Sequence, residues 1–125
     1  HAVEILGREN LAILHCTSTY PCALNELNLA TIPSLSKRYG IPVGYSGHEV
    51  VFIPSYSAAL MGACIIERHL TLDRAMWGSD QAASLEPAAF AKLVKYIRAV
   101  PEMLGDGRKV VYESEIPVRT KLRRK

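Results

Sequence analysis

The sequence predicts an α/β fold with parallel strands. Apolar runs of strand length at residues 11–16, 41–48 and 63–69 alternate with segments of helical spacing, and this alternation is typical of a parallel sheet. A polar loop follows each apolar run. Because a strand–helix–strand unit makes its two strands parallel, we expect all three loops to meet at one edge of the sheet.

Two helices are predicted before the second strand, from the residues that would begin or end them. Residues 2–6 are typical of the last turns of a helix closed by Gly7. A second helix is predicted to begin near Thr31 and to end at Gly40, with Ile32 and Leu35 on one face.

Two more helices are predicted after the second strand. Residues 54–62 form one short helical segment between the second and third apolar runs. The longest helix follows the third run. Ser84 is its predicted N-cap, apolar residues recur at helical spacing from Phe90 to Ile97, and Pro101 is expected to interrupt it.

Three parallel strands leave two long, apolar, unpaired edges, which stable sheets avoid. The sequence also opens on a predicted helix end. We therefore expect a partial TIM (β/α) barrel of about three parallel βα units, a fragment of an eight-unit barrel. Residues 1–104 are expected to be its C-terminal portion, and residues 105–125, which lose periodicity, a linker toward a missing domain.

Composition limits the class of protein. The net charge is +3, and five of the seven residues in 119–125 are basic. This run is interpreted as a solvated linker rather than a nucleic-acid patch, because no aromatic residue interleaves the charges. Cys16, Cys22 and Cys64 form no CxxC pair, which favours a reducing, cytoplasmic compartment. No apolar stretch approaches the length of a membrane span, so no membrane association is expected.

Two histidines stand at the ends of predicted strands. His48 closes the second apolar run and His69 the third. Imidazoles that converge at one sheet edge are a candidate half-site for a divalent metal. Gly44 and Gly47 flank Tyr45 and Ser46, just before His48. Glycines at these positions allow an anion such as phosphate to approach the backbone closely. The alternative is a tight turn with an exposed histidine.

The third strand carries Glu67, Arg68 and His69 in succession. Strand alternation places Glu67 and His69 on one face and Arg68 on the other. Glu67 is therefore a candidate to hold a water or to orient the metal-binding imidazole. The alternative is a buried Glu67–Arg68 ion-pair network with no catalytic role.

The other two loops also carry polar candidates. Residues 17–20 offer three hydroxyl side chains and Tyr20, although a turn that bonds its own backbone is the commoner role of such residues. The loop at residues 71–85 is long and carries Asp73, Arg74, Trp77 and Asp80. Long loops over the active edge are often lids, although Arg74 and Trp77 are also compatible with plain rim positions.

Four motifs resemble the sialic acid synthase (N-acetylneuraminate synthase, NeuB) family. They are HCTSTYP at residues 15–21, GYSGH at 44–48, ERH at 67–69 and GSDQAASLEP at 78–87. The resemblance covers nearly the whole chain, in order and at the right spacing. It implies a transferase that condenses phosphoenolpyruvate with an N-acetylated aminosugar, typically N-acetylmannosamine, to give sialic acid and phosphate. It also implies a TIM-barrel catalytic domain followed by an antifreeze-like (SAF) domain.

The resemblance also assigns roles to residues of this chain. His48 and His69 match metal-binding histidines, with Mn²⁺ or Mg²⁺ as the ion. The catalytic candidates are Glu67 and His69. Ser46 matches a hydroxyl that helps to hold phosphoenolpyruvate, and Ser18, Tyr20 and Asp80 match positions that contact the aminosugar. In the full-length protein it implies a homodimer, whose small domain reaches into the partner subunit's site, and no nucleic-acid partner.

Two departures from the family pattern concern recognition. Many relatives have Asn at the position of Ser18 and Asp at the position of Gly47, and the first departure leaves the aminosugar open. The family's lysines for phosphoenolpyruvate match positions before residue 1, so we expect the isolated 125 residues to turn over no substrate. The alternatives are a synthase for legionaminic or pseudaminic acid, and a non-catalytic half-barrel module that binds metal or sugar phosphate.

Overall fold

The fold is built on three parallel strands. The computed structural model describes residues 1–123. Strands β1 (Ile13–Cys16), β2 (Val43–Gly47) and β3 (Ile66–Arg68) form one sheet in the order β1-β2-β3. Both pairings are parallel, so the predicted α/β class with three parallel strands is confirmed. The central strand β2 therefore fixes the register of both neighbours.

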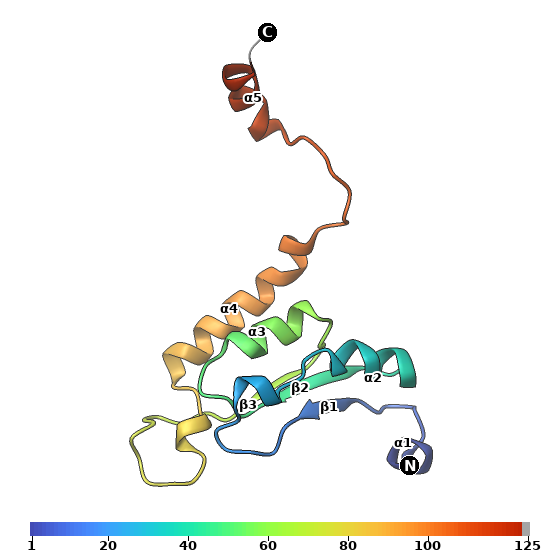
Figure 1. The fold of residues 1–125 in the computed structure, drawn as a ribbon, viewed down its shortest axis with the longest axis vertical. Coiled ribbons are helices and arrows are strands. Elements are labelled where there is room, and N and C mark those ends of the chain that lie inside the picture. Colours follow the sequence, from blue (N-terminus) through green and yellow to red (C-terminus); the bar gives the residue numbers. More distant parts are fainter. Residues whose placement is uncertain (124–125) are drawn as a thin grey trace.

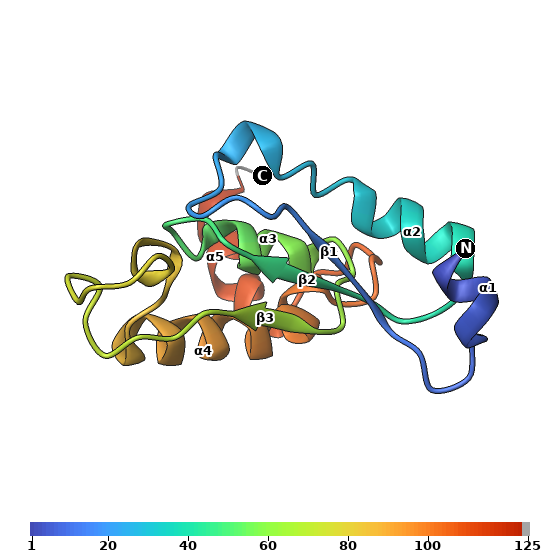
Figure 2. The ribbon, with the colours of Figure 1, turned by 90° about the horizontal axis from the view of Figure 1, so that it is seen from below.

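Helices connect the strands and cover one side of the sheet. In Figure 2 the three strands lie in front of α3 and no helix lies in front of them. Figure 1 shows α5 at the end of an extended segment, away from the sheet. The helices are α1 (Ala2–Leu6), α2 (Thr31–Tyr39), α3 (Ile53–Leu60), α4 (Pro87–Leu104) and α5 (Ile116–Leu122), and short 3₁₀ turns lie at Leu24–Glu26, Gln81–Ala83 and Glu113–Glu115.

The core lies between β2 and the helices. Val43 and Tyr45 project from β2 toward Ile32 of α2 and Ala58 of α3, and these four side chains are almost fully buried. Alternation along β2 then places Ser46, on the other side of the strand, away from this core. One face of the sheet therefore supplies packing, and the other is left for polar side chains.

The second and third predicted strands are longer than the observed ones at both ends, and the first is longer only at its start. The ladder between β2 and β3 ends where Gly47 pairs with Arg68. Beyond it the carbonyl of His48 accepts a bond from Cys22 N–H at 3.0 Å, and the carbonyl of His69 accepts one from Leu85 N–H at 2.8 Å. Both histidines thus lie one residue past the sheet, because their backbones bond to loops instead of to each other.

The predicted ends of the longest helix are wrong. Ser84 is not the N-cap: its hydroxyl donates to the carbonyl of Asp80 at 2.8 Å, and α4 begins at Pro87, where proline's fixed φ suits the first helical position. Pro101 does not interrupt α4, which continues to Leu104. The proline removes one backbone bond, the one that an N–H at position 101 would donate to the carbonyl of Ile97, and the last turn forms around it. Gly105, with φ of 58°, ends the helix.

The segment after α4 is more ordered than predicted. It contains the turn at Glu113–Glu115 and helix α5, whereas the sequence indicates no periodic structure there. All its described residues, up to Arg123, are exposed, and residues 124–125 of the predicted linker lie outside the described part. That this segment leads to a further domain stays a prediction.

Membrane insertion is not indicated by any helix. Within residues 1–123, none combines the length and the apolar character that crossing a bilayer requires.

Gly44 permits the close approach of the strands. A Cβ atom at this position would lie 2.7 Å from the carbonyl oxygen of Ile65 and 3.1 Å from Cγ of Leu14. We predict that Gly44→Ala lowers the free energy of unfolding by about 1–3 kcal/mol, the usual cost of overpacking. Chemical denaturation measures this loss. Ser36→Ala, on the exposed side of α2, is the control, and equal stability of the two variants would contradict the prediction.

Candidate active site

Two imidazoles meet at the carboxyl end of the sheet. His48 directly follows β2 and His69 directly follows β3. Their ring centroids are 5.2 Å apart and their planes are nearly perpendicular, at 86°. The predicted convergence of the two residues is thus present in the structure, and it follows from the parallel pairing of adjacent strands.

The surroundings of His48 define its tautomer. Its Nδ1 lies 2.9 Å from the carbonyl oxygen of Thr17, which can only accept a hydrogen bond. We therefore assign the proton of the neutral ring to Nδ1, which leaves a lone pair on Nε2. The Sγ of Cys16 lies 3.8 Å from the same Nδ1. His48 is 4% exposed, so the first and second loops together hold this ring in place.

His69 is oriented from the third loop. Its Nδ1 lies 3.5 Å from Oδ2 of Asp80, and both side chains are partly exposed. The other carboxylate oxygen of Asp80 accepts a hydrogen bond from Ser79 Oγ at 2.8 Å. In metal-binding histidines, the ring nitrogen that does not bind the metal usually donates its hydrogen to a carboxylate, a carbonyl or a water. The structure thus brings together Asp80 and His69, which lie eleven residues apart in sequence.

Tyr20 joins the first loop to both histidines. Its ring centroid lies 4.2 Å from that of His48 and 5.6 Å from that of His69. The tyrosine remains 44% exposed, so it borders the pair without closing it off. All three loops that follow the strands therefore contribute a side chain to one place.

Ser46 and Glu67 form a second polar pair beside the histidines. They are opposite each other in the ladder, and Ser46 Oγ donates a hydrogen bond to Glu67 Oε1 at 2.7 Å. Because side chains alternate along a strand, Ser46 and Glu67 lie on the same face as the two histidines. Ser18, the remaining candidate, lies at the exposed edge of this group, with its Oγ 3.7 Å from Cys16 Sγ.

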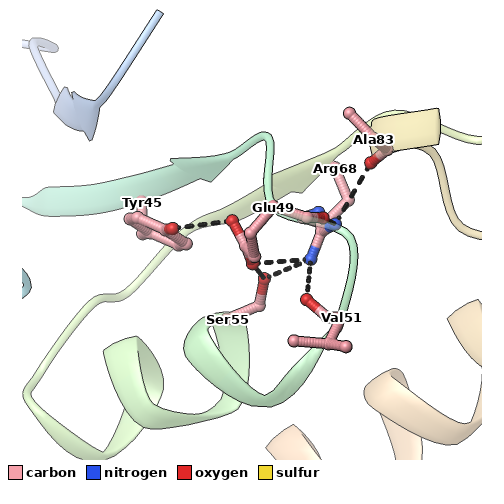
Figure 3. A network of polar contacts seen from close by, with 6 residues as sticks. All are labelled: Tyr45, Glu49, Val51, Ser55, Arg68 and Ala83. Atoms are coloured by element: carbon pink, nitrogen blue, oxygen red, sulfur yellow. Dashed lines mark hydrogen bonds and ion pairs between the residues drawn. The ribbon is translucent and has the colours of Figure 1, made fainter. Parts of the chain in front are cut away.

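The alternative of a Glu67–Arg68 ion pair is wrong. Arg68 Nη1 lies 2.7 Å from Oε1 of Glu49, and both side chains are fully buried. Glu67 instead bonds to Ser46 on the opposite face, because adjacent residues of a strand point to opposite sides. The carboxylate that compensates Arg68 comes from the loop after β2 (Figure 3).

The ion pair is surrounded by further hydrogen bonds, as Figure 3 shows. The hydroxyls of Tyr45 and Ser55 donate to the two carboxylate oxygens of Glu49, at 2.8 and 3.1 Å. Arg68 also donates to the carbonyls of Val51 and Ala83, at 3.1 and 3.2 Å. Such bonds offset the cost of burying the two charges, although Nε of Arg68 is buried without a hydrogen-bond partner among the described residues.

Glu49 was missed as a structural residue by the sequence analysis. It directly follows His48 and precedes two valines. A carboxylate next to an apolar run needs a cationic partner if it is buried, and this is the signal that points to it. The sequence does not reveal which cation pairs with it, because Arg68 lies nineteen residues away.

Burial changes the acid–base properties of this network. Burial raises the pKa of the Tyr45 hydroxyl well above its usual range, and the adjacent carboxylate of Glu49 raises it further. Burial lowers the pKa of the Arg68 guanidinium, and Glu49 acts in the opposite direction. Tyr45 therefore remains a neutral hydrogen-bond donor across the ordinary pH range.

The donor set at the site suits a divalent cation in part. In the described residues 1–123, no group of three or more His, Cys, Asp or Glu side chains is arranged to hold a metal. His48 and His69 supply two imidazoles, and the Nδ1 of His48 is already used by Thr17, which leaves its Nε2 for an ion. Two protein ligands fit an ion that keeps open positions for substrate and water.

The family model described as "NeuB family" matches residues 1–109. The chain belongs to the NeuB family. The resemblance of the four motifs is thereby confirmed. This membership covers all the residues of the site, from Ser18 to Asp80.

Named relatives of this NeuB-family chain are synthases of nonulosonic acids. The N,N'-diacetyllegionaminic acid synthase of Legionella pneumophila is 40% identical over 114 residues, which cover 91% of this chain and 32% of the relative. The N-acetylneuraminate-9-phosphate synthase of Homo sapiens is 42% identical over 114 residues, covering 90% of this chain and 32% of the relative. The chain thus spans about a third of the length of these relatives.

A solved structure of the family shares the fold. The N-acetylneuraminic acid (sialic acid) synthetase of Leptospira borgpetersenii superposes with a TM-score of 0.74 at 39% identity. The match covers 91% of this chain and 41% of that one. The arrangement of strands and helices around the two histidines is therefore one that a sialic acid synthetase also contains.

The raised pKa of Tyr45 predicts a pH effect on stability. An unfolded tyrosine ionises near pH 10, whereas Tyr45 in the folded NeuB-family chain stays protonated to higher pH. The unfolded state then loses protons first, so stability falls as the pH rises above about 10. We predict that Tyr45→Phe makes this alkaline loss smaller, while lowering stability at pH 7 by about 1 kcal/mol through the lost hydrogen bond to Glu49.

Denaturant unfolding between pH 7 and 11 measures both effects of Tyr45→Phe. Tyr96→Phe, at a partly exposed position of α4, is the control and should keep the alkaline loss of the unchanged protein. An identical alkaline loss in Tyr45→Phe and in the unchanged protein would show that Tyr45 is not the responsible group.

Proposed function

We propose that this chain forms part of the active site of a metal-dependent nonulosonic acid synthase. The reaction is the condensation of phosphoenolpyruvate with an N-acetylated aminosugar, such as N-acetylmannosamine, to give a sialic acid and phosphate. The observation that carries the proposal is the meeting of His48, His69, Tyr20 and Asp80 at one sheet edge. Membership of the NeuB family supports it.

The two imidazoles would hold the cation, Mn²⁺ or Mg²⁺, through their Nε2 atoms, because both Nδ1 atoms lie beside oxygen atoms of Thr17 and Asp80. When bound, such an ion supplies Lewis-acid polarisation of the aldehyde oxygen of the open-chain aminosugar. Carbon 3 of phosphoenolpyruvate then attacks carbon 1 of the sugar, water adds to carbon 2, and cleavage of the carbon–oxygen bond releases phosphate. Thr17 and Asp80 keep the two rings oriented for this task.

Ser46 and Glu67 are paired in the ladder, on the same face of the sheet as the two histidines. We assign Ser46 to phosphoenolpyruvate binding, and Glu67 to holding the attacking water by accepting its hydrogen bond. Their mutual hydrogen bond of 2.7 Å orients the hydroxyl and the carboxylate in the absence of substrate. The exposure of Glu67 leaves its second oxygen available to a water.

Ser18, Tyr20 and Asp80 are assigned to the aminosugar. The ring of Tyr20 and the carboxylate of Asp80 flank His69 from different loops, so a sugar aldehyde at the cation would have both within reach. Because the relative of Legionella pneumophila is a legionaminic acid synthase, a diacetylated aminosugar is the second candidate substrate.

The complete reaction is proposed for a complete barrel. Residues 1–104 would be the C-terminal portion of that TIM barrel, since the chain spans about a third of its relatives. The isolated 125 residues are expected to release no phosphate from the two substrates. Robust turnover by them alone in a phosphate-release assay would contradict this part of the proposal.

Removing either imidazole is predicted to abolish synthesis. For the assay, residues 1–109 replace the matching segment of the Legionella pneumophila synthase, and phosphate release is measured with phosphoenolpyruvate, aminosugar and Mn²⁺. Loss of a cation ligand removes several kcal/mol of transition-state stabilisation, so we expect His48→Ala and His69→Ala to lower kcat by about 100-fold or more.

His15→Gln is the matched control for the two histidine variants. His15 lies on the same sheet, and its Nε2 bonds to the carbonyl of Leu27 at 2.6 Å, a contact that a glutamine amide can reproduce. This variant should keep most of the activity. A folded chimera in which His48→Ala and His69→Ala are as active as His15→Gln would overturn the assignment of the cation site.

Ser18 is predicted to influence the choice of aminosugar. It lies at the exposed edge of the site. An asparagine amide extends further than a serine hydroxyl and carries its donor and acceptor on separate atoms. We expect Ser18→Asn to change kcat/KM for N-acetylmannosamine relative to a diacetylated aminosugar by about 10-fold, the usual scale of one polar contact. Competition between the two sugars in the chimera measures the ratio. Thr19→Asn is the neighbouring control, and an unchanged ratio in Ser18→Asn would remove Ser18 from the recognition site.

A further inference from the structure

We propose that the buried Glu49–Arg68 ion pair is a positioning device that sets the separation and orientation of His48 and His69. The inference rests on the proposed function, because it treats these two imidazoles as the cation ligands. It adds two positioning residues, Glu49 and Arg68, which lie on the side of the sheet opposite to Ser46 and Glu67.

The first argument is the position of the pair along the chain. Glu49 directly follows His48, and Arg68 directly precedes His69. Each charged residue is therefore joined by one peptide bond to one imidazole-bearing residue. Because both side chains are fully buried and bonded to their surroundings, the pair restrains the backbone next to both histidines.

The second argument is that no sheet hydrogen bond links the histidines. The ladder of β2 and β3 ends at the pair of Gly47 and Arg68. The carbonyls of His48 and His69 bond to Cys22 and Leu85, in two separate loops. The ion pair is thus a direct polar contact between the ends of β2 and β3, next to the point where the ladder stops.

The third argument is that one guanidinium gathers several segments. Arg68 donates to the carboxylate and carbonyl of Glu49, to Ser55 Oγ at 3.0 Å in α3, and to the carbonyl of Ala83. Ala83 lies in the 3₁₀ turn that follows Asp80. The same side chain therefore also fixes the loop whose carboxylate approaches His69.

The planar fork of arginine is what this role requires. Its donors point in fixed directions, so Arg68 can reach the loop after β2, helix α3 and the loop after β3 at once (Figure 3). A lysine keeps the charge but presents a single nitrogen. Arg68→Lys therefore tests the geometry separately from the charge, and Glu49→Gln tests the charge with little change of shape.

The experiment compares the unchanged full chain with Arg68→Lys and Glu49→Gln at one pH. Two properties are measured: the affinity for Mn²⁺ alone, from the electron paramagnetic resonance signal of the free ion, and the ¹⁵N chemical shifts of the imidazole rings in the metal-free protein. We expect both variants to bind Mn²⁺ about 10-fold more weakly, the scale for groups behind metal ligands. The ring signals of His48 and His69 should move, while those of His15 should not.

Leu93→Ala is the control for stability. Leu93 is buried in α4, so this variant lowers the unfolding temperature without touching the loops of the site. It should keep the Mn²⁺ affinity and the ring shifts. If a substitution at Glu49 or Arg68 prevents folding, Ser55→Ala is the milder second variant. It removes one hydrogen-bond partner of each charged group and leaves the ion pair in place. It should move the same two ring signals by less.

The outcomes separate the two proposals. Ring shifts and Mn²⁺ affinity that match those of Leu93→Ala would overturn the positioning role. If the unchanged protein binds no Mn²⁺, the assignment of the cation site fails, and the ring shifts alone decide whether the ion pair positions the histidines.

Discussion

The parallel pairing of β2 with both neighbours determines where the residues of the candidate site emerge from the sheet. Because β1 and β3 flank β2 in the same direction, the residues that follow the three strands emerge together. Tyr20, His48 and His69 are brought within 4.2–5.6 Å of one another in this way. The same pairing divides the sheet into an apolar face around Val43 and Tyr45 and a polar face around Ser46 and Glu67.

The parts that sequence reasoning captured are those that repeat regularly. Alternation of apolar runs and helical segments predicts the three parallel strands, and their order predicts the meeting of His48 and His69. The ends of helices were harder to predict. Ser84 is of a residue type that favours N-caps, but its hydroxyl donates to the carbonyl of Asp80. The partner of Arg68 was also out of reach: strand alternation argues against Glu67, but nothing local points to Glu49, nineteen residues away.

The site combines two kinds of support. The polar face holds Glu67 and His69, which are at least partly exposed, whereas the opposite face holds a fully buried carboxylate and guanidinium. Buried ion pairs contribute little net stability in general, because desolvation offsets much of their attraction. Their directional bonds nonetheless restrict the backbone to one arrangement. In this NeuB-family chain the restriction falls on the residues next to His48 and His69.

The loop between β3 and α4 is closed at its base. Leu85 exchanges backbone hydrogen bonds with His69 and Thr71, while Trp77 near the tip is fully exposed. Length and sequence at the tip can therefore change without moving the histidine at the root. This loop therefore joins a root that is held in place to a tip that is open to variation, so substitutions around Trp77 leave the backbone next to His69 unchanged.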